Sequence, residues 1–131
     1  MTENGWNFWL EDKLALLNEF IEQLTNDIRS RRNLNKMFLK ELNKEIRTIQ
    51  DGIEELKHWT LGNSQVIETR RLALETELLR LSELKRTWLA GAWKDIQFLK
   101  RQLRHFQSEQ RSLTRLQRAY SNGSPGNNGP N

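Results

Sequence analysis

The sequence contains no cysteine, and its 131 residues include only two prolines and seven glycines. The lack of cysteine excludes disulfide bonds and thiolate chemistry. Between residues 6 and 119 proline is absent and glycine occurs only at positions 52, 62 and 91, so little there interrupts regular secondary structure. Hydrophobic residues make up 36% of the chain and charged residues 29%, which suits a helical protein with a thin apolar seam.

Long apolar runs are also missing. None approaches the roughly 18 residues of a transmembrane helix. The N-terminal stretch MTENGWNFWLEDK is acidic and lacks the basic and apolar regions of a secretory signal. We therefore expect a soluble, intracellular (cytoplasmic) protein that does not bind membranes.

What the sequence does contain is a heptad pattern, in which apolar residues recur at alternating spacings of four and three. We refer to these positions as the seam. In the first half of the chain the seam comprises Leu10, Leu14, Leu17, Ile21, Leu24 and Ile28, then Leu39, Leu42, Ile46, Ile49, Ile53 and Leu56. In the second half it comprises Ile67, Leu74, Leu78, Leu81, Trp88, Ala92, Ile96, Leu99, Leu103, Phe106, Leu113 and Tyr120, with Arg71, Lys85, Gln110 and Gln117 as polar interruptions.

The seam predicts an all-α fold with two long helices. We expect a helix over about residues 7–58, a turn over 60–64 and a second helix over about 65–119. Gly62 and Asn63 supply the residues that end a helix. The polar Gly/Asn/Pro segment 121–131 is expected to be a disordered tail.

The two helices are expected to form a long antiparallel hairpin, a coiled coil of roughly 75–80 Å. In such a hairpin the numbers of paired residues have a constant sum, and seam pairs such as Leu17 with Phe106 fit a sum of 123 or 124. Each half also carries a four-residue insertion in its heptads, a stutter, because Leu24 and Leu42, like Leu81 and Leu99, are 18 residues apart. Gly91 lies within the second stutter, where a small residue would permit close approach.

Apolar side chains outside the seam predict self-association. A bare hairpin leaves them uncovered, so we expect two hairpins to form a homodimeric four-helix bundle. The alternative is a compact monomeric four-helix bundle with loops at residues 30–36 and 90–92. The candidate dimer interface consists of Trp9, Leu16, Phe20, Phe38, Leu72, Leu79, Leu89 and Trp93. Trp88 and Trp93 are also interpreted as packing in the core.

Charge is segregated along the chain. Residues 1–28 carry a net −5, whereas residues 29–47 and 94–118 each carry a net +5. The expected register lays the first acidic segment against the second basic one and leaves 29–47 without such a partner. There, five cations spaced by four or three residues form one line along the helix, which we refer to as the basic row: Arg32, Lys36, Lys40, Lys44 and Arg47.

Lines of cations can follow the phosphates of a duplex without reading its bases. The competing interpretation is a solvated face with partners such as Glu41 and Glu45 on the same helix. The candidate phosphate-binding residues are Arg29, Arg31, Arg32, Lys36, Lys40, Lys44, Arg47, Arg80, Lys85 and Arg86. Arg31 and Arg32 of this set, together with Asn35, occupy seam positions and are expected to form a polar layer there.

No catalytic motif or cofactor site is found. Glu55 and His58 form one E-x-x-H motif, but a di-iron bundle needs a second, and the other histidine, His105, has Gln102 in place of the glutamate. The serines lie in no nucleophile motif, and no glycine-rich phosphate loop is present. We therefore expect no enzyme, no bound metal and no cofactor.

Two functions remain. The first is a non-enzymatic coiled-coil protein that associates with itself and docks partners, including acidic protein surfaces. The second is a sequence-independent binder of double-stranded RNA or DNA. No stretch of the chain matches a family signature. By analogy of architecture alone, long basic helical dimers include stalk and scaffold proteins and the duplex-RNA-binding silencing suppressors of some small viruses.

Overall fold

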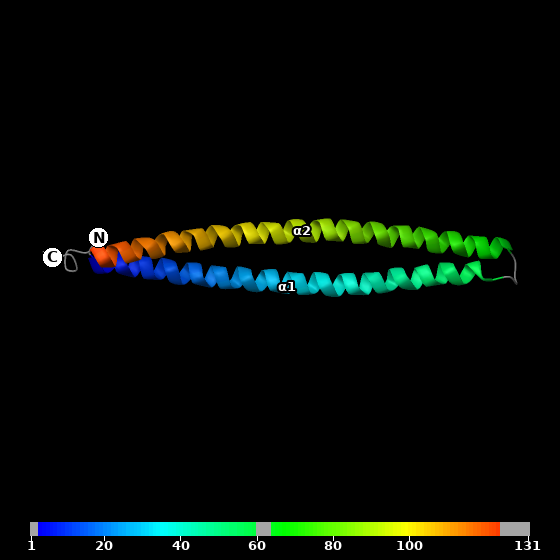
Figure 1. The fold of residues 1–131 in the computed structure, drawn as a ribbon, viewed down its shortest axis with the longest axis horizontal. Helices are drawn as coiled ribbons and strands as arrows, with labels where there is room; N and C mark the ends of the chain where they lie inside the picture. Colours follow the sequence, from blue (N-terminus) through cyan, green and yellow to red (C-terminus); the bar gives the residue numbers. More distant parts are fainter. Residues whose placement is uncertain (1–2, 60–63, 124–131) are drawn as a thin grey trace. The chain divides into compact units, whose positions relative to one another are not determined.

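The computed structural model describes residues 3–59 and 64–123 of the chain. These residues form two helices, α1 (Glu3–Lys57) and α2 (Ser64–Gly123), and no strand (Figure 1). The expected all-α hairpin is confirmed: segments of α1 and α2 pack against each other in opposite directions. Within the described part of the chain, neither helix carries an apolar stretch long enough to span a membrane.

Both helices extend beyond the limits that the seam suggests. Contacts between aromatic rings hold the extended ends: the ring of Trp6 lies 5.1 Å from that of Trp9 and 6.3 Å from that of Tyr120. At the other end of α1 the amide of His58 donates to the carbonyl of Glu55 at 3.1 Å, which tightens the last turn.

Of the expected turn, only Ser64 lies within the described residues. Of the expected tail, residues 121–123 belong to α2, and residues 124–131 lie outside the described residues.

Residues 30–36 and 90–92 are helical. The compact monomeric alternative requires loops at both places, and the structure has none there. A four-residue insertion in a heptad pattern is accommodated by local straightening of the supercoil, so the helix does not have to break.

The chain divides into two compact units. Unit 1 comprises residues 1–30 and 96–131, and unit 2 comprises residues 31–95. In unit 1, Ile28, Ile96 and Leu99 form a buried cluster, against which Leu24 and Leu103 pack. Leu10 and Leu17 are buried farther along the same unit. In unit 2 the buried residues are Leu42, Leu56 and Leu81. Every one of these buried side chains is a seam residue.

Several side-chain contacts between the helices join residues whose numbers add to 126, slightly more than the expected 123 or 124. In unit 1 the ring pairs Trp6–Tyr120 and Phe20–Phe106 have numbers that add to 126. In unit 2 the pairs Phe38–Trp88 and Arg31–Asp95 give the same sum. The buried cluster of unit 1 groups Ile28 with Ile96 and Leu24 with Leu99, whose numbers add to the expected 124 and 123. A seam side chain packs among several residues of the facing helix, so contacts whose sums differ by a few residues belong to one antiparallel arrangement.

Candidate functional site

The basic row lies on α1 in unit 2, and all five of its side chains are exposed. None of them forms an ion pair with any residue that the structure describes. Successive members are four or three residues apart, so the row extends about 22 Å at 1.5 Å per residue. The basic row is therefore an exposed line of cations without neutralising partners.

Several other cations of unit 2 do have ion-pair partners. On α2, Arg71 pairs with Glu68, and Arg80 pairs with Glu77 through a 2.9 Å bond from Nε. Farther along, Arg86 pairs with Glu83, and near the end of α1, Lys57 pairs with Glu54 at 2.9 Å. In each of these pairs the acid precedes the base by three residues, a spacing that places both side chains on one side of a helix. These cations already have local partners.

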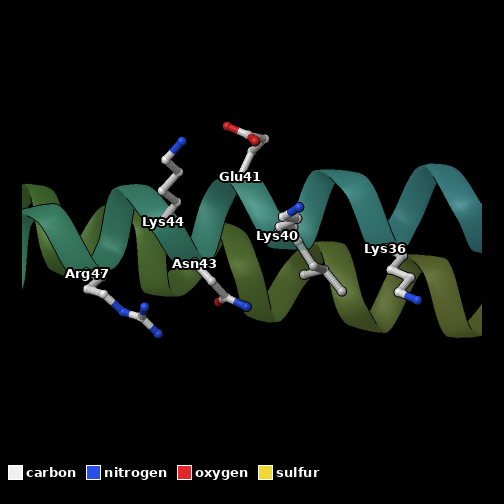
Figure 2. A pocket seen from close by; sticks show the side chains of 7 residues that line it. Lys36, Lys40, Glu41, Asn43, Lys44 and Arg47 are labelled. Atoms are coloured by element: carbon white, nitrogen blue, oxygen red, sulfur yellow. The ribbon is translucent and has the colours of Figure 1, made fainter.

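The nearest acids do not neutralise the basic row. Figure 2 shows Lys36, Asn43 and Arg47 extending to one side of α1, whereas Glu41 extends to the other side together with Lys44. Glu45 lies near α2, because its charge contributes to raising the pKa of Arg80, after the hydrogen bond and the charge of Glu77. The same Arg80 lowers the pKa of Glu77, chiefly through the hydrogen bonds that it donates to that carboxylate.

A shallow groove of about 740 Å³ runs along this part of α1 (Figure 2). Its lining consists of Lys36, Leu39, Lys40, Glu41, Asn43, Lys44 and Arg47. Leu39 is its single apolar residue, and no aromatic ring contributes. The groove therefore offers charge and hydrogen-bond donors beside the aliphatic stems of its lysines and arginine, and no aromatic surface.

The remaining candidates for phosphate binding fall into different environments. Arg31 pairs with Asp95 across the hairpin at 2.5 Å, so its charge is already offset. The same holds for Arg80 and Arg86 beside their glutamates. Lys85 is half-buried, and Arg29 is exposed in unit 1. Only the five residues of the basic row remain grouped, exposed and without ion-pair partners.

Apolar side chains outside the seam form a groove in unit 1, which we refer to as the aromatic groove. It has a volume of about 510 Å³ and lies between α1 and α2. Trp9, Leu16, Phe20, Phe106 and Leu113 supply most of its apolar lining, and Lys13 places its ammonium 5.9 Å from the ring of Trp9. Phe98 lines an adjoining hollow with His105 and Phe106. Phe98 and His105 are absent from the predicted interface, although the position of Phe98 outside the seam was a usable signal.

In unit 2 the exposed apolar residues of the predicted interface all lie on α2, where Leu72, Leu79, Leu89 and Trp93 form what we refer to as the apolar row. Leu72, Leu79 and Trp93 repeat at multiples of seven residues, which places them along one line of the helix. Leu79 and Trp93 are each 64% exposed. Core packing of Trp93 is therefore wrong. Phe38 is half-buried and stacks on Trp88, with ring centres 4.0 Å apart.

No ion pair joins an acid of α1 to a base of α2 among the described residues of unit 1. One polar contact between the helices there is a hydrogen bond from the Gln110 amide to Asn18. The acidic side chains between residues 11 and 27 are exposed to solvent, as are the bases Arg104 and Arg111.

Comparison with known proteins gives no relative. No family model, no curated protein and no solved structure matches the chain. The described residues contain no group of three or more His, Asp or Glu side chains that could hold a metal ion. The two surfaces of the molecule that bear on its function are therefore the basic row and the exposed apolar side chains.

Proposed function

We propose that this protein is a non-enzymatic assembly protein that associates with a second copy of itself. One observation carries the proposal: in the described residues, sixteen large hydrophobic side chains are exposed, whereas eight hydrophobic side chains are buried. Soluble monomers seldom leave contiguous apolar surface of this kind uncovered. Burying it against a partner removes apolar area from water, which is the main driving force for association.

Two surfaces would carry the association, the aromatic groove in unit 1 and the apolar row in unit 2. The groove combines large aromatic rings with flanking polar residues such as Lys13 and Glu109, a composition typical of interface centres. The apolar row repeats at heptad spacing, which suits packing against another helix with the same repeat.

Charge favours a second copy as the partner in unit 1. The α1 segment 1–28 carries −5, and the α2 segment 96–118 of the same unit carries +5. Among the described residues of unit 1, no ion pair joins these acids of α1 to these bases of α2. If a two-fold axis runs parallel to the helices, α1 of one copy lies over α2 of the other, and acid faces base in both halves of the interface.

The test is sedimentation equilibrium at micromolar concentration, where the wild-type protein should be a dimer. Replacing Leu72 and Leu79 by lysine places two charges in the apolar row and should yield monomers. The matched control replaces Leu34 and Met37 by lysine. These two side chains are similarly exposed, at 63% and 65%, but lie on α1 away from the seam, so this variant should remain dimeric. A monomeric wild-type protein would refute the proposal, and dissociation of the control alone would place the interface elsewhere.

A further inference from the structure

We infer that the basic row binds the sugar-phosphate backbone of a double-stranded nucleic acid, independently of base sequence. This inference does not depend on the proposed self-association, because it concerns a different set of side chains. It rests on the absence of ion-pair partners, on the length and spacing of the row, and on the composition of the groove beside it.

The absence of ion-pair partners distinguishes this row from the arginines of unit 2 that lie beside a glutamate. Elsewhere in unit 2 the cations Arg71, Arg80 and Arg86 each have a glutamate three residues earlier in the chain. In the basic row the residue three positions earlier is an acid only for Lys44, and Glu41 makes no ion pair with it. Like charges four residues apart repel one another, so the row weakens the helix that carries it. A bound polyanion would remove this repulsion.

The position of the row leaves it accessible. Arg31 and Phe38 are seven residues apart and contact α2 along one edge of α1. At 3.6 residues per turn, the basic row lies beyond the opposite edge of the seam, away from those contacts. Because four residues advance slightly more than one turn, the row also winds slowly around α1, as Lys44 and Arg47 illustrate in Figure 2.

The dimensions of the row fit a repeating anion. Neighbouring members are separated by about 4.5 to 6 Å along the helix axis, and the row spans about 22 Å. The same length of B-form duplex carries on the order of a dozen phosphate charges, so every cation can reach one. A single phosphate group would engage only one or two of the five side chains.

The residues that line the groove indicate whether the polyanion is a single strand, a membrane surface or a duplex. A protein that binds a single strand generally stacks bases on aromatic side chains, and the groove lacks them. A helix that lies on a membrane surface inserts a broad apolar face beside its cations, whereas Leu39 is half-buried in the seam and only Leu34 and Met37 are exposed apolar side chains on this stretch of α1. A duplex presents its phosphates outward and needs only charge and hydrogen-bond donors.

The test uses 20-base-pair duplexes of RNA and of DNA, each in two unrelated sequences, titrated over a range of salt concentrations. In the row variant Arg32, Lys36, Lys40 and Lys44 are replaced by glutamine. The matched control removes the same charge from α2 of unit 1 by replacing Arg104, Arg111, Arg115 and Arg118 with glutamine. No ion pair joins these four arginines to an acid of α1, but the net charge of −5 over residues 1–28 of the same unit lowers the positive potential around them, so they should contribute little to binding.

The wild-type protein should bind all four duplexes, with an affinity that falls as salt rises. The row variant should lose about tenfold or more in affinity at low salt, and each lost contact should reduce the slope of log K against log salt by about 0.7–0.9. The control should stay within about threefold of the wild type. Replacing Lys36, Lys40 and Lys44 by arginine should preserve binding, because charge rather than residue identity is required.

Four outcomes would overturn the inference. The first is a wild-type protein that binds no duplex at low salt, and the second is a control that loses as much affinity as the row variant. Binding to one of the two sequences alone would contradict backbone recognition. Tighter binding to phosphatidylserine vesicles than to duplexes would assign the row to a membrane surface. Circular dichroism of each variant shows whether a lost affinity reflects unfolding.

Discussion

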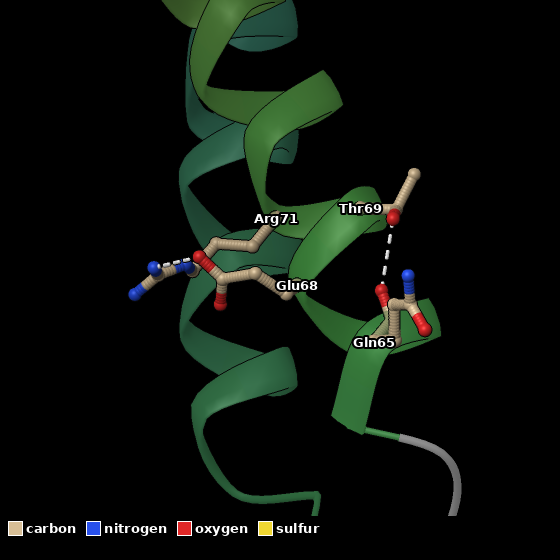
Figure 3. Close-up of polar contacts among 4 residues, drawn as sticks. All are labelled: Gln65, Glu68, Thr69 and Arg71. Atoms are coloured by element: carbon tan, nitrogen blue, oxygen red, sulfur yellow. Dashed lines mark hydrogen bonds and ion pairs between the residues drawn. The ribbon is translucent and has the colours of Figure 1, made fainter.

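At the scale of single residues, Arg71 combines two environments in one side chain. It occupies a seam position of α2, and its Nε is enclosed and donates to no acceptor in the described part of the chain. Its terminal Nη2 remains accessible and pairs with Glu68 (Figure 3). That pairing, and the charges of Glu68 and Glu75, raise the pKa of the Arg71 guanidinium above its ordinary value. An enclosed hydrogen-bond donor without an acceptor lowers the free energy of unfolding. The exposed ion pair with Glu68 compensates for little of that loss.

Arg71→Leu should therefore raise the melting temperature. Leucine continues the apolar seam and removes the enclosed Nε, while Glu68 stays solvated. Arg80→Leu is the matched control, because Arg80 also pairs with a glutamate three residues earlier but has a largely exposed side chain. Thermal unfolding followed by circular dichroism compares the two variants, and an equal or lower melting temperature for Arg71→Leu contradicts the argument.

At the scale of the helices, Gly91 does not have the role that its place in the stutter suggests. A Cβ atom built at Gly91 meets nothing within 4 Å, so the residue is not needed for close approach of α1, and that interpretation is wrong. Instead, Gly91 lines an open groove of about 370 Å³ with Asn35, Trp88 and Ala92. In the interior of an exposed helix, glycine is less stable than alanine because it loses more backbone entropy on folding. At position 91 no close packing compensates for this loss.

Gly91→Ala should consequently stabilise α2 by about 0.5–1 kcal/mol. Gly52 offers the comparison, since a Cβ there would lie 3.5 Å from Cδ1 of Leu74, an ordinary packing distance. Gly52→Ala should stabilise by a similar or slightly larger amount. Urea unfolding of both variants measures the change in the free energy of unfolding. A loss of stability in Gly91→Ala would mean that the groove at this position is occupied in solution.

The helices can be predicted from the sequence because the seam is regular, and all eight buried residues belong to it. The pairing of seam residues is predictable as well, since Ile28 with Ile96 and Leu24 with Leu99 lie in one buried cluster. Individual contacts such as Phe38–Trp88 and Arg31–Asp95 are harder to predict, because they depend on the side-chain conformations of aromatic and charged residues.

The candidate site is predictable to a similar extent. The line of cations from Arg32 to Arg47 follows from their spacing alone. Which cations are neutralised does not, because that depends on side-chain conformation and on residues brought from the other helix. Arg31 shows this clearly: its partner Asp95 lies 64 positions away in the sequence.

At the scale of the whole molecule, the apolar surface that a single chain leaves exposed should make the melting temperature depend on protein concentration. The buried core of a single chain is thin, so much of the folding free energy of the assembled protein should come from association. The melting temperature should therefore rise when the protein concentration is increased tenfold, by mass action on the dimer. The variant with lysine at positions 72 and 79 should melt at the same temperature at both concentrations. Scanning calorimetry at two concentrations tests this, and a concentration-independent wild type would contradict it.

The division of the chain into two nested units also sets an order of events during synthesis. Unit 2 is continuous, so its segments can pair as soon as residue 95 has left the ribosome. The first 30 residues have their partners between residues 96 and 123, and the hydrogen bond between Asn18 and Gln110 spans 92 positions. At about 5–20 residues per second, Trp9 and Phe20 wait several seconds without the helix that they will contact. Among the described segments, this nascent N-terminal stretch is the one most in need of a chaperone.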